Sequence, residues 1–99
     1  MPLIGKLIRN YLFPRKGYVL EHVQGPLLHS LLVGKLHEEV EELSRDQERP
    51  DEYGDVLEVL LTLAKLNGLK YEDIQQAMIR KREQLGGFDQ GNYVKRDKA

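Results

Sequence analysis

Four carboxylates in two short acidic segments carry the strongest chemical signal of the sequence. They are, in chain order, Glu39, Glu42, Glu52 and Asp55. They form two pairs with i, i+3 spacing, which places both members of a pair on one face of a helix. Carboxylates that face one another at 4 Å repel by about 1 kcal/mol in water and by about 4 kcal/mol at an effective dielectric of 20. Hard divalent cations offset this repulsion, and the absence of a histidine at i+3 favours Mg²⁺ or Mn²⁺ over a di-iron site.

The helical phase of these carboxylates argues against the competing interpretation, which is that they form a solvated acidic face. At roughly 100° per residue, Glu39 falls inside the apolar arc of Leu28, Leu32, Leu36 and Leu43. Glu52 likewise falls within the apolar arc of its own segment, whereas the second member of each pair lies at the border of an arc. Solvated faces have no such inward carboxylates. The other acidic residues of the first segment, Glu38 and Glu41, are expected to face water.

Three helices are expected to position these residues. Apolar periodicity, Pro50 and Gly68 predict helices over about 27–45, 50–67 and 71–85. The segment before them is irregular, and residues 88–99 form a polar tail. A short break between the first two helices makes them antiparallel neighbours, which brings the acidic pairs to one level. The expected fold is all-α, a single domain over 1–99 that forms an antiparallel helical bundle.

The second predicted helix is apolar around well over half of its circumference. Its apolar residues are Val56, Leu57, Val59, Leu60, Leu61, Leu63, Ala64 and Leu66. An amphipathic helix of a small monomer needs an apolar stripe of only about 100°. Three helices cannot surround one of their own number, so the bundle is expected to be completed by oligomerisation, as a homodimer or homotetramer.

Composition excludes several classes of protein. The 99 residues include 15 Lys and Arg, 16 Asp and Glu and no cysteine, and the formal net charge is −1. This balance argues against a nucleic-acid partner, and the missing cysteines exclude disulfides and thiolate chemistry. No segment approaches the roughly 20 apolar residues of a membrane span or has the apolar stretch of a signal peptide. We therefore expect a soluble cytoplasmic protein without a membrane partner.

Taken in order, these motifs resemble a known family. Glu38-Glu39-x-x-Glu42 followed by Glu52-x-x-Asp55 is similar to the signature of the MazG-like all-α nucleoside triphosphate pyrophosphohydrolases, which include phosphoribosyl-ATP pyrophosphohydrolase. Lys6-Leu-Ile-Arg9, the run Asp55-Val-Leu-Glu-Val-Leu60 and Gly86-Gly-Phe88 resemble a branch of small proteins in that superfamily. The resemblance spans about residues 6–88. Asn10 and Leu85 depart from the branch, which has Asp and a basic residue there.

The resemblance implies Mg²⁺-dependent cleavage of an NTP or dNTP to the monophosphate and pyrophosphate, with removal of aberrant nucleotides as one role. It implies that the four carboxylates are metal ligands, and that Glu38 either supports these ligands or assists the attacking water. It also implies that Lys6 and Arg9 bind the substrate phosphates. Lys81 is a further substrate-binding candidate from its phase, because it shares a stripe with Ile74, Met78 and Leu85.

Other functions remain open at this point. Besides the pyrophosphohydrolase, a second hypothesis is a protein with the same fold that binds nucleotide or metal without turnover. A third hypothesis is a plain helical oligomerisation module. Burying carboxylates such as Glu39 and Glu52 costs free energy, so they are not expected in a protein that serves only as an oligomerisation module. A helix-turn-helix DNA-binding protein is disfavoured by the net charge and the acidic hairpin.

Overall fold

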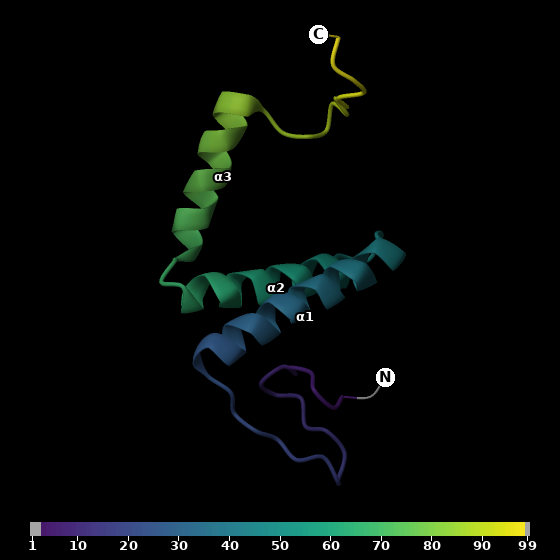
Figure 1. Cartoon of the computed structure of the whole chain (residues 1–99), viewed down its shortest axis with the longest axis vertical. Helices are drawn as coiled ribbons and strands as arrows, with labels where there is room; N and C mark the ends of the chain where they lie inside the picture. Colours follow the sequence, from purple (N-terminus) through teal and green to yellow (C-terminus); the bar gives the residue numbers. More distant parts are fainter. Residues whose placement is uncertain (1–2, 99) are drawn as a thin grey trace. The chain divides into compact units, whose positions relative to one another are not determined.

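The computed structural model describes residues 3–98, and it is all-helical over that range. The helices are α1 (Gly25–Arg45), α2 (Pro50–Leu66) and α3 (Tyr71–Leu85), with no strand among the described residues (Figure 1). The expected helix bounds differ from these by at most two residues. The chain divides between Leu69 and Lys70 into two compact units. We call the part up to Leu69 the hairpin unit and the part from Lys70 onward the α3 unit.

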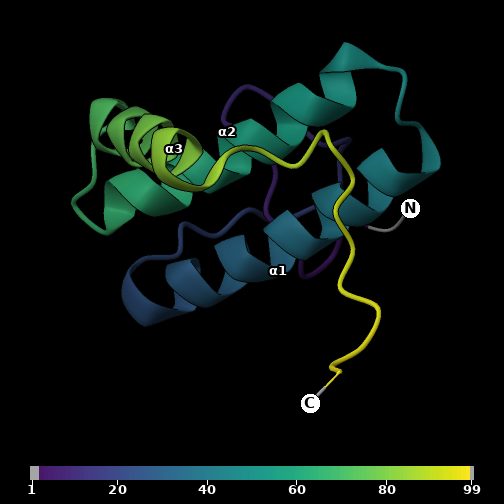
Figure 2. The same ribbon diagram turned by 90° about the horizontal axis from the view of Figure 1, so that it is seen from above.

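The helical hairpin of α1 and α2 forms the centre of the first unit. Gly25 begins α1 with a φ of 62°, a left-handed conformation that suits glycine, and Pro26 follows where a missing N–H costs nothing. Residues 46–49 connect the helices, and the Tyr53 hydroxyl donates a hydrogen bond to the Gln47 carbonyl at 2.9 Å. α1 and α2 then lie side by side, as Figures 1 and 2 both show. The hairpin therefore brings the end of α1 beside the start of α2.

The α3 unit consists of α3 and the segment that follows it. Lys70 precedes the helix, and its backbone N–H donates to the Asp73 carboxylate at 2.8 Å, so a side chain from the first turn supplies the cap. Gly86 ends the helix with a φ of 81°, and its N–H donates to the Arg82 carbonyl at 2.8 Å. No residue of α3 is buried.

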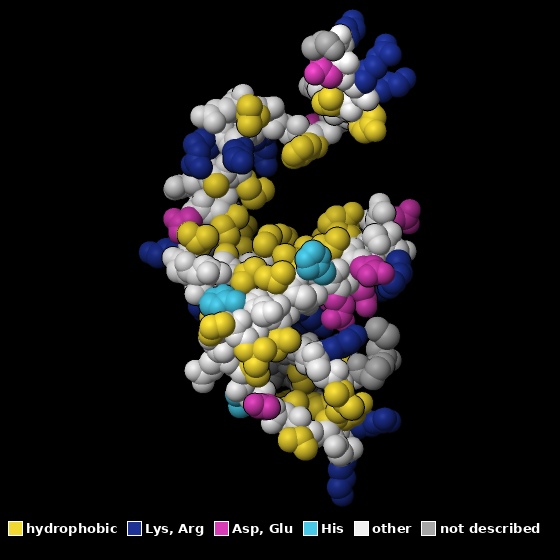
Figure 3. All heavy atoms as spheres, in the orientation of Figure 1, with side chains coloured by type: hydrophobic (Ala, Val, Ile, Leu, Met, Phe, Trp, Pro, Cys, Tyr) yellow, Lys and Arg dark blue, Asp and Glu magenta, His cyan; other side chains and the backbone are white. Residues whose placement is uncertain are grey.

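Very few side chains of the described chain are buried. Leu32 is the buried hydrophobic residue, and Glu52 is the buried charged one. Large apolar residues of the hairpin stay exposed, with Leu57 at 52% and Tyr53 at 49% of their surface. Figure 3 shows hydrophobic side chains along the hairpin surface. No helix among residues 3–98 is both long and apolar enough to cross a membrane.

Candidate metal centre

Three of the four predicted carboxylates meet at the turn end of the hairpin. Glu39 reaches the site from α1, and Glu52 and Asp55 reach it from the first two turns of α2. Each offers an oxygen, and these oxygens lie within 4.8 Å of one another. Acidic side chains gather at this end of the hairpin in Figure 3. Because the three oxygens come from two helices, the hairpin fold itself builds the group, which we call the acidic cluster.

Burial distinguishes the acidic cluster from a solvated acidic face. Glu52 keeps 8% of its surface exposed, and the side chain of Glu39 keeps 13%. The Oε2 atom of Glu52 is buried and has no hydrogen-bond partner among the described residues. A buried charged oxygen without a partner is costly. A divalent cation would satisfy this oxygen, and three carboxylates are the hard oxygen donors that Mg²⁺ prefers, so the residues present fit Mg²⁺.

The electrostatics of Glu52 agree with its burial. Burial raises the pKa of the Glu52 carboxyl above its ordinary value of 4.5. The Arg49 guanidinium, 3.5 Å from Glu52 Oε1, acts in the opposite direction, and the negative charges of Glu42 and Asp55 raise the pKa further. The site thus holds a carboxylate that a cation would stabilise in its charged form.

Two predicted residues lie outside the acidic cluster. Glu42, predicted as the fourth ligand, is exposed on α1 and acts on Glu52 through its charge. Glu38 was expected to face water, but this expectation is wrong because its side chain is only 29% exposed. Its Oε1 atom lies 3.3 Å from the Lys6 ammonium and 3.6 Å from the Lys35 ammonium. The irregular segment before α1 covers Glu38, and helical phase alone carries no information about that cover.

The two N-terminal cations suggested by the family resemblance both reach this site. The Lys6 ammonium donates to Glu38, and the Arg9 guanidinium donates to Asp55 at 2.5 Å. The segment before α1 therefore crosses both helices of the hairpin near the acidic cluster. Lys81, the third candidate, belongs to the α3 unit, where it is exposed.

Sequence reasoning missed two cations that pair with the acidic cluster. Lys35 lies 3.4 Å from Glu39 Oε1, and Arg49 lies 3.5 Å from Glu52 Oε1. The signal was available, because Lys35 stands at i, i+4 to Glu39 and Arg49 at i, i+3 to Glu52. These cations neutralise part of the negative charge when no metal ion is bound.

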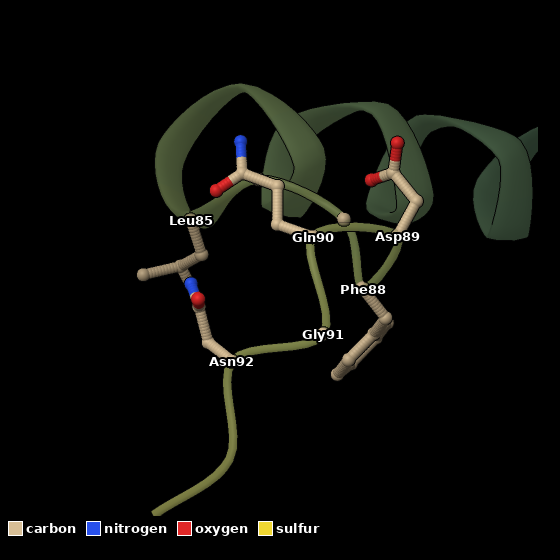
Figure 4. A pocket seen from close by; sticks show the side chains of 8 residues that line it. Leu85, Phe88, Asp89, Gln90, Gly91 and Asn92 are labelled. Atoms are coloured by element: carbon tan, nitrogen blue, oxygen red, sulfur yellow. The ribbon is translucent and has the colours of Figure 1, made fainter.

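A separate hollow lies at the end of α3. It has a volume of about 160 Å³ and is lined by residues 85–92 (Figure 4). Asp89 is the one charged residue among those that line it, and the Phe88 side chain is exposed. A hollow without a basic side chain does not attract a triphosphate, so it contributes no candidate phosphate site.

Replacing Arg9 with alanine is expected to strengthen metal binding at the acidic cluster. Arg9 and a metal ion would compete for Asp55, and the ion pair is largely exposed, with 62% of the Arg9 side chain accessible. An exposed ion pair has a small effect, so Mn²⁺ affinity should rise about two- to five-fold. Isothermal titration of each protein with Mn²⁺ measures this affinity. Arg45→Ala, which breaks an exposed pair with Glu41, is the matched control, and equal affinities of Arg9→Ala and wild type would contradict the competition.

The functional assignment depends on the residues of this site. Its three carboxylates, the partnerless buried oxygen of Glu52 and the nearby cations are features of the chain itself. Comparisons with protein-family models, with curated proteins and with solved structures found no match.

Proposed function

We propose that the protein is a Mg²⁺-dependent nucleoside triphosphate pyrophosphohydrolase of the MazG-like type. One observation carries the proposal: Glu39, Glu52 and Asp55 converge from two helices, and one oxygen of the buried Glu52 has no partner. A scaffold gains nothing from such an arrangement, whereas a phosphoryl-transfer site needs a cation held by carboxylates. The order of acidic motifs along the chain supports the same activity.

The proposed reaction is hydrolysis between the α- and β-phosphates. Water attacks the α-phosphorus, the bond to the bridging oxygen breaks, and pyrophosphate leaves as the nucleoside monophosphate forms. Mg²⁺ held by the acidic cluster would neutralise phosphate charge and lower the pKa of water. Glu38 accepts the proton of the attacking water in this proposal, because it adjoins Glu39 on α1 and is half-buried.

Basic side chains complete the proposed substrate site. Arg9 pairs with Asp55 of the acidic cluster, and Lys6 pairs with Glu38, the neighbour of Glu39 in sequence, so both charges are already near the place where a triphosphate would arrive. Both would exchange a carboxylate partner for phosphate oxygens once a cation occupies the cluster. The assignment of Lys81 to substrate binding stays a prediction from its helical phase alone, because Lys81 belongs to the α3 unit.

A nucleotide panel tests the activity. Each NTP and dNTP is incubated with the protein and Mg²⁺, and pyrophosphate and monophosphate are measured together. We expect equal amounts of both products from at least one nucleotide, and none when EDTA replaces Mg²⁺. Release of inorganic phosphate with a diphosphate would contradict the proposed bond cleavage. No hydrolysis of any nucleotide, with a melting temperature that Mg²⁺ still raises, would instead favour a binding protein of the same fold.

The bundle is proposed to be completed by a second copy of the chain in the cytoplasm. The support is the exposed apolar surface of the hairpin, where Val40, Leu57 and Leu60 remain 48%, 52% and 37% exposed. With Leu32 as the buried hydrophobic residue of the described chain, one copy has almost no core of its own. Covering α2 with a second hairpin would give both copies the missing core.

The substitution Leu57→Glu is expected to break this assembly. Leu57 lies on the exposed side of α2, so a charge there would have to be desolvated in an interface but not in a single chain. Light scattering after size exclusion should give at least twice the chain mass of 11.5 kDa for wild type, and a smaller mass for the variant. Lys65→Glu introduces the same residue at an exposed polar position and should leave the mass unchanged. A monomeric wild type at micromolar concentration contradicts the proposed assembly.

A further inference from the structure

A hollow between the segment before α1 and the side of α1 has basic walls. Its volume is about 230 Å³, and its polar lining comes from Lys6, Ser30, Lys35 and Glu38. Small-molecule sites usually occupy about 300–1,000 Å³, so this hollow suits a group of a ligand better than a whole nucleotide. We call it the lysine hollow.

The two lysines of the lysine hollow are held close together. The Lys6 and Lys35 ammonium groups both approach Glu38 Oε1, and their side chains are only 27% and 22% exposed. Lys35 also approaches Glu39, which is a member of the acidic cluster. The Lys35 side chain therefore links the lysine hollow to the candidate metal centre.

The lysine hollow would favour an anion once a cation holds Glu39. Two ammonium groups face the one carboxylate of the lining, Glu38, and Lys35 also pairs with Glu39, whose charge a bound cation would neutralise. Each ammonium has three N–H donors. Among residues 3–98, Lys6 makes one hydrogen bond, and Lys35 takes part in ion pairs alone. Unused donors of both lysines, together with the Ser30 hydroxyl, match the many acceptor oxygens of a phosphate group.

The walls of the lysine hollow leave room for such a group. Gly34, on α1, and Gly5, in the preceding segment, both line it. A Cβ atom added at either glycine would meet nothing within 4 Å. Gly34 is interior to a helix, where glycine costs about 1 kcal/mol relative to alanine. The space is thus kept open at a position where almost any other residue would stabilise the helix.

We propose that the lysine hollow binds phosphate groups, and that Lys35 is a substrate-binding residue. If the chain has the proposed pyrophosphohydrolase activity, on which this assignment rests, the group is the pyrophosphate part of the nucleotide. No aromatic residue lines the hollow, and its volume excludes base and sugar together with the phosphates. The pyrophosphate end is the part of the substrate that cationic side chains can bind without contacts to the base or the sugar.

Binding of inorganic pyrophosphate in the presence of Mg²⁺, measured by isothermal titration on the full chain, tests the assignment. Lys35→Ala should weaken binding about 10-fold or more, since hydrogen bonds to charged groups are the strong ones. Lys65→Ala, a lysine of α2 outside the lining, should stay within two-fold of wild type. Binding that Lys35→Ala leaves unchanged would overturn the proposal.

A second variant keeps every charge and fills the space. Gly34→Leu should raise the melting temperature through helix propensity, yet weaken pyrophosphate binding, while Gly34→Ala should raise stability and bind nearly as wild type. The Lys35→Ala variant should still bind Mn²⁺, which EPR can follow. If this variant lost Mn²⁺ binding and pyrophosphate binding together, Lys35 would only support the carboxylates, and the proposal would be overturned.

These measurements separate this assignment from the proposed enzyme activity. Pyrophosphate binding that depends on Lys35 in a chain that hydrolyses no nucleotide would retain the phosphate site and reject the activity. Nucleotide hydrolysis with pyrophosphate binding that does not depend on Lys35 would retain the activity and reject the site.

Discussion

Replacing Asp55 with asparagine, or Glu39 with glutamine, is expected to lower the rate of pyrophosphate release by more than about 100-fold. Residues that only support metal ligands already cost 10–100-fold when they are mutated. Asp55 and Glu39 each supply an oxygen of the acidic cluster, so their loss should exceed that range. The side-chain amides are close in size to the carboxylates, and the change therefore isolates charge. Steady-state rates at saturating Mg²⁺ measure the effect.

The matched control for these substitutions is Glu41→Gln. Glu41 lies on the same helix as Glu39, but it is 67% exposed and pairs with Arg45. Its substitution should leave the rate within about two-fold of wild type, the scale of an exposed ion pair. If Asp55→Asn and Glu39→Gln retained the wild-type rate, the acidic cluster would not be the reaction site.

Replacing Glu52 with glutamine should stabilise the protein in the absence of metal and abolish the stabilisation by Mg²⁺. The carboxylate of Glu52 is buried beside Asp55 and Glu39, and one of its oxygens has no partner. A neutral amide removes the repulsion at the cost of the pair with Arg49. We expect the melting temperature in EDTA to rise by about 4 °C or more, a shift typical of a modest stability change in a domain of this size.

The pH dependence of stability supplies an internal check on this variant. Because the pKa of Glu52 is raised in the folded protein, the folded state binds this proton more tightly than the unfolded state does. The stabilisation from Glu52 is therefore full below the ordinary pKa of 4.5, and it is lost as the pH rises through the raised pKa. Thermal melts in EDTA from pH 4 upward should show this loss in wild type and not in Glu52→Gln. Parallel curves for the two proteins would contradict the burial argument.

The helices and the inward carboxylates were accessible from sequence for a physical reason. Apolar periodicity, Pro50 and Gly68 act locally, so the helix bounds follow from near neighbours. Helical phase likewise identified Glu39 and Glu52 as inward residues, and both are largely covered. Local rules are sufficient wherever the contacts of a residue come from its own helix or the adjacent one.

The surroundings of Glu38 were not accessible from sequence. The segment before α1 has no periodicity, so its path across the hairpin and the ion pairs of Lys6 and Arg9 depend on tertiary contacts. The family resemblance suggested those two cations, whereas the residues alone did not. Glu42 illustrates the opposite limit, because i, i+3 spacing with Glu39 places it on the same face without bringing it into the acidic cluster.

Binding of Mn²⁺ to the acidic cluster, followed by the EPR signal of free Mn²⁺, tests the central claim most directly. Wild type should remove Mn²⁺ from solution, Mg²⁺ should displace it, and Glu41→Gln should bind as wild type does. Asp55→Asn and Glu39→Gln should leave the Mn²⁺ free at the same concentrations. Equal Mn²⁺ binding by wild type and both of these variants would show that Glu39, Glu52 and Asp55 do not form a metal centre.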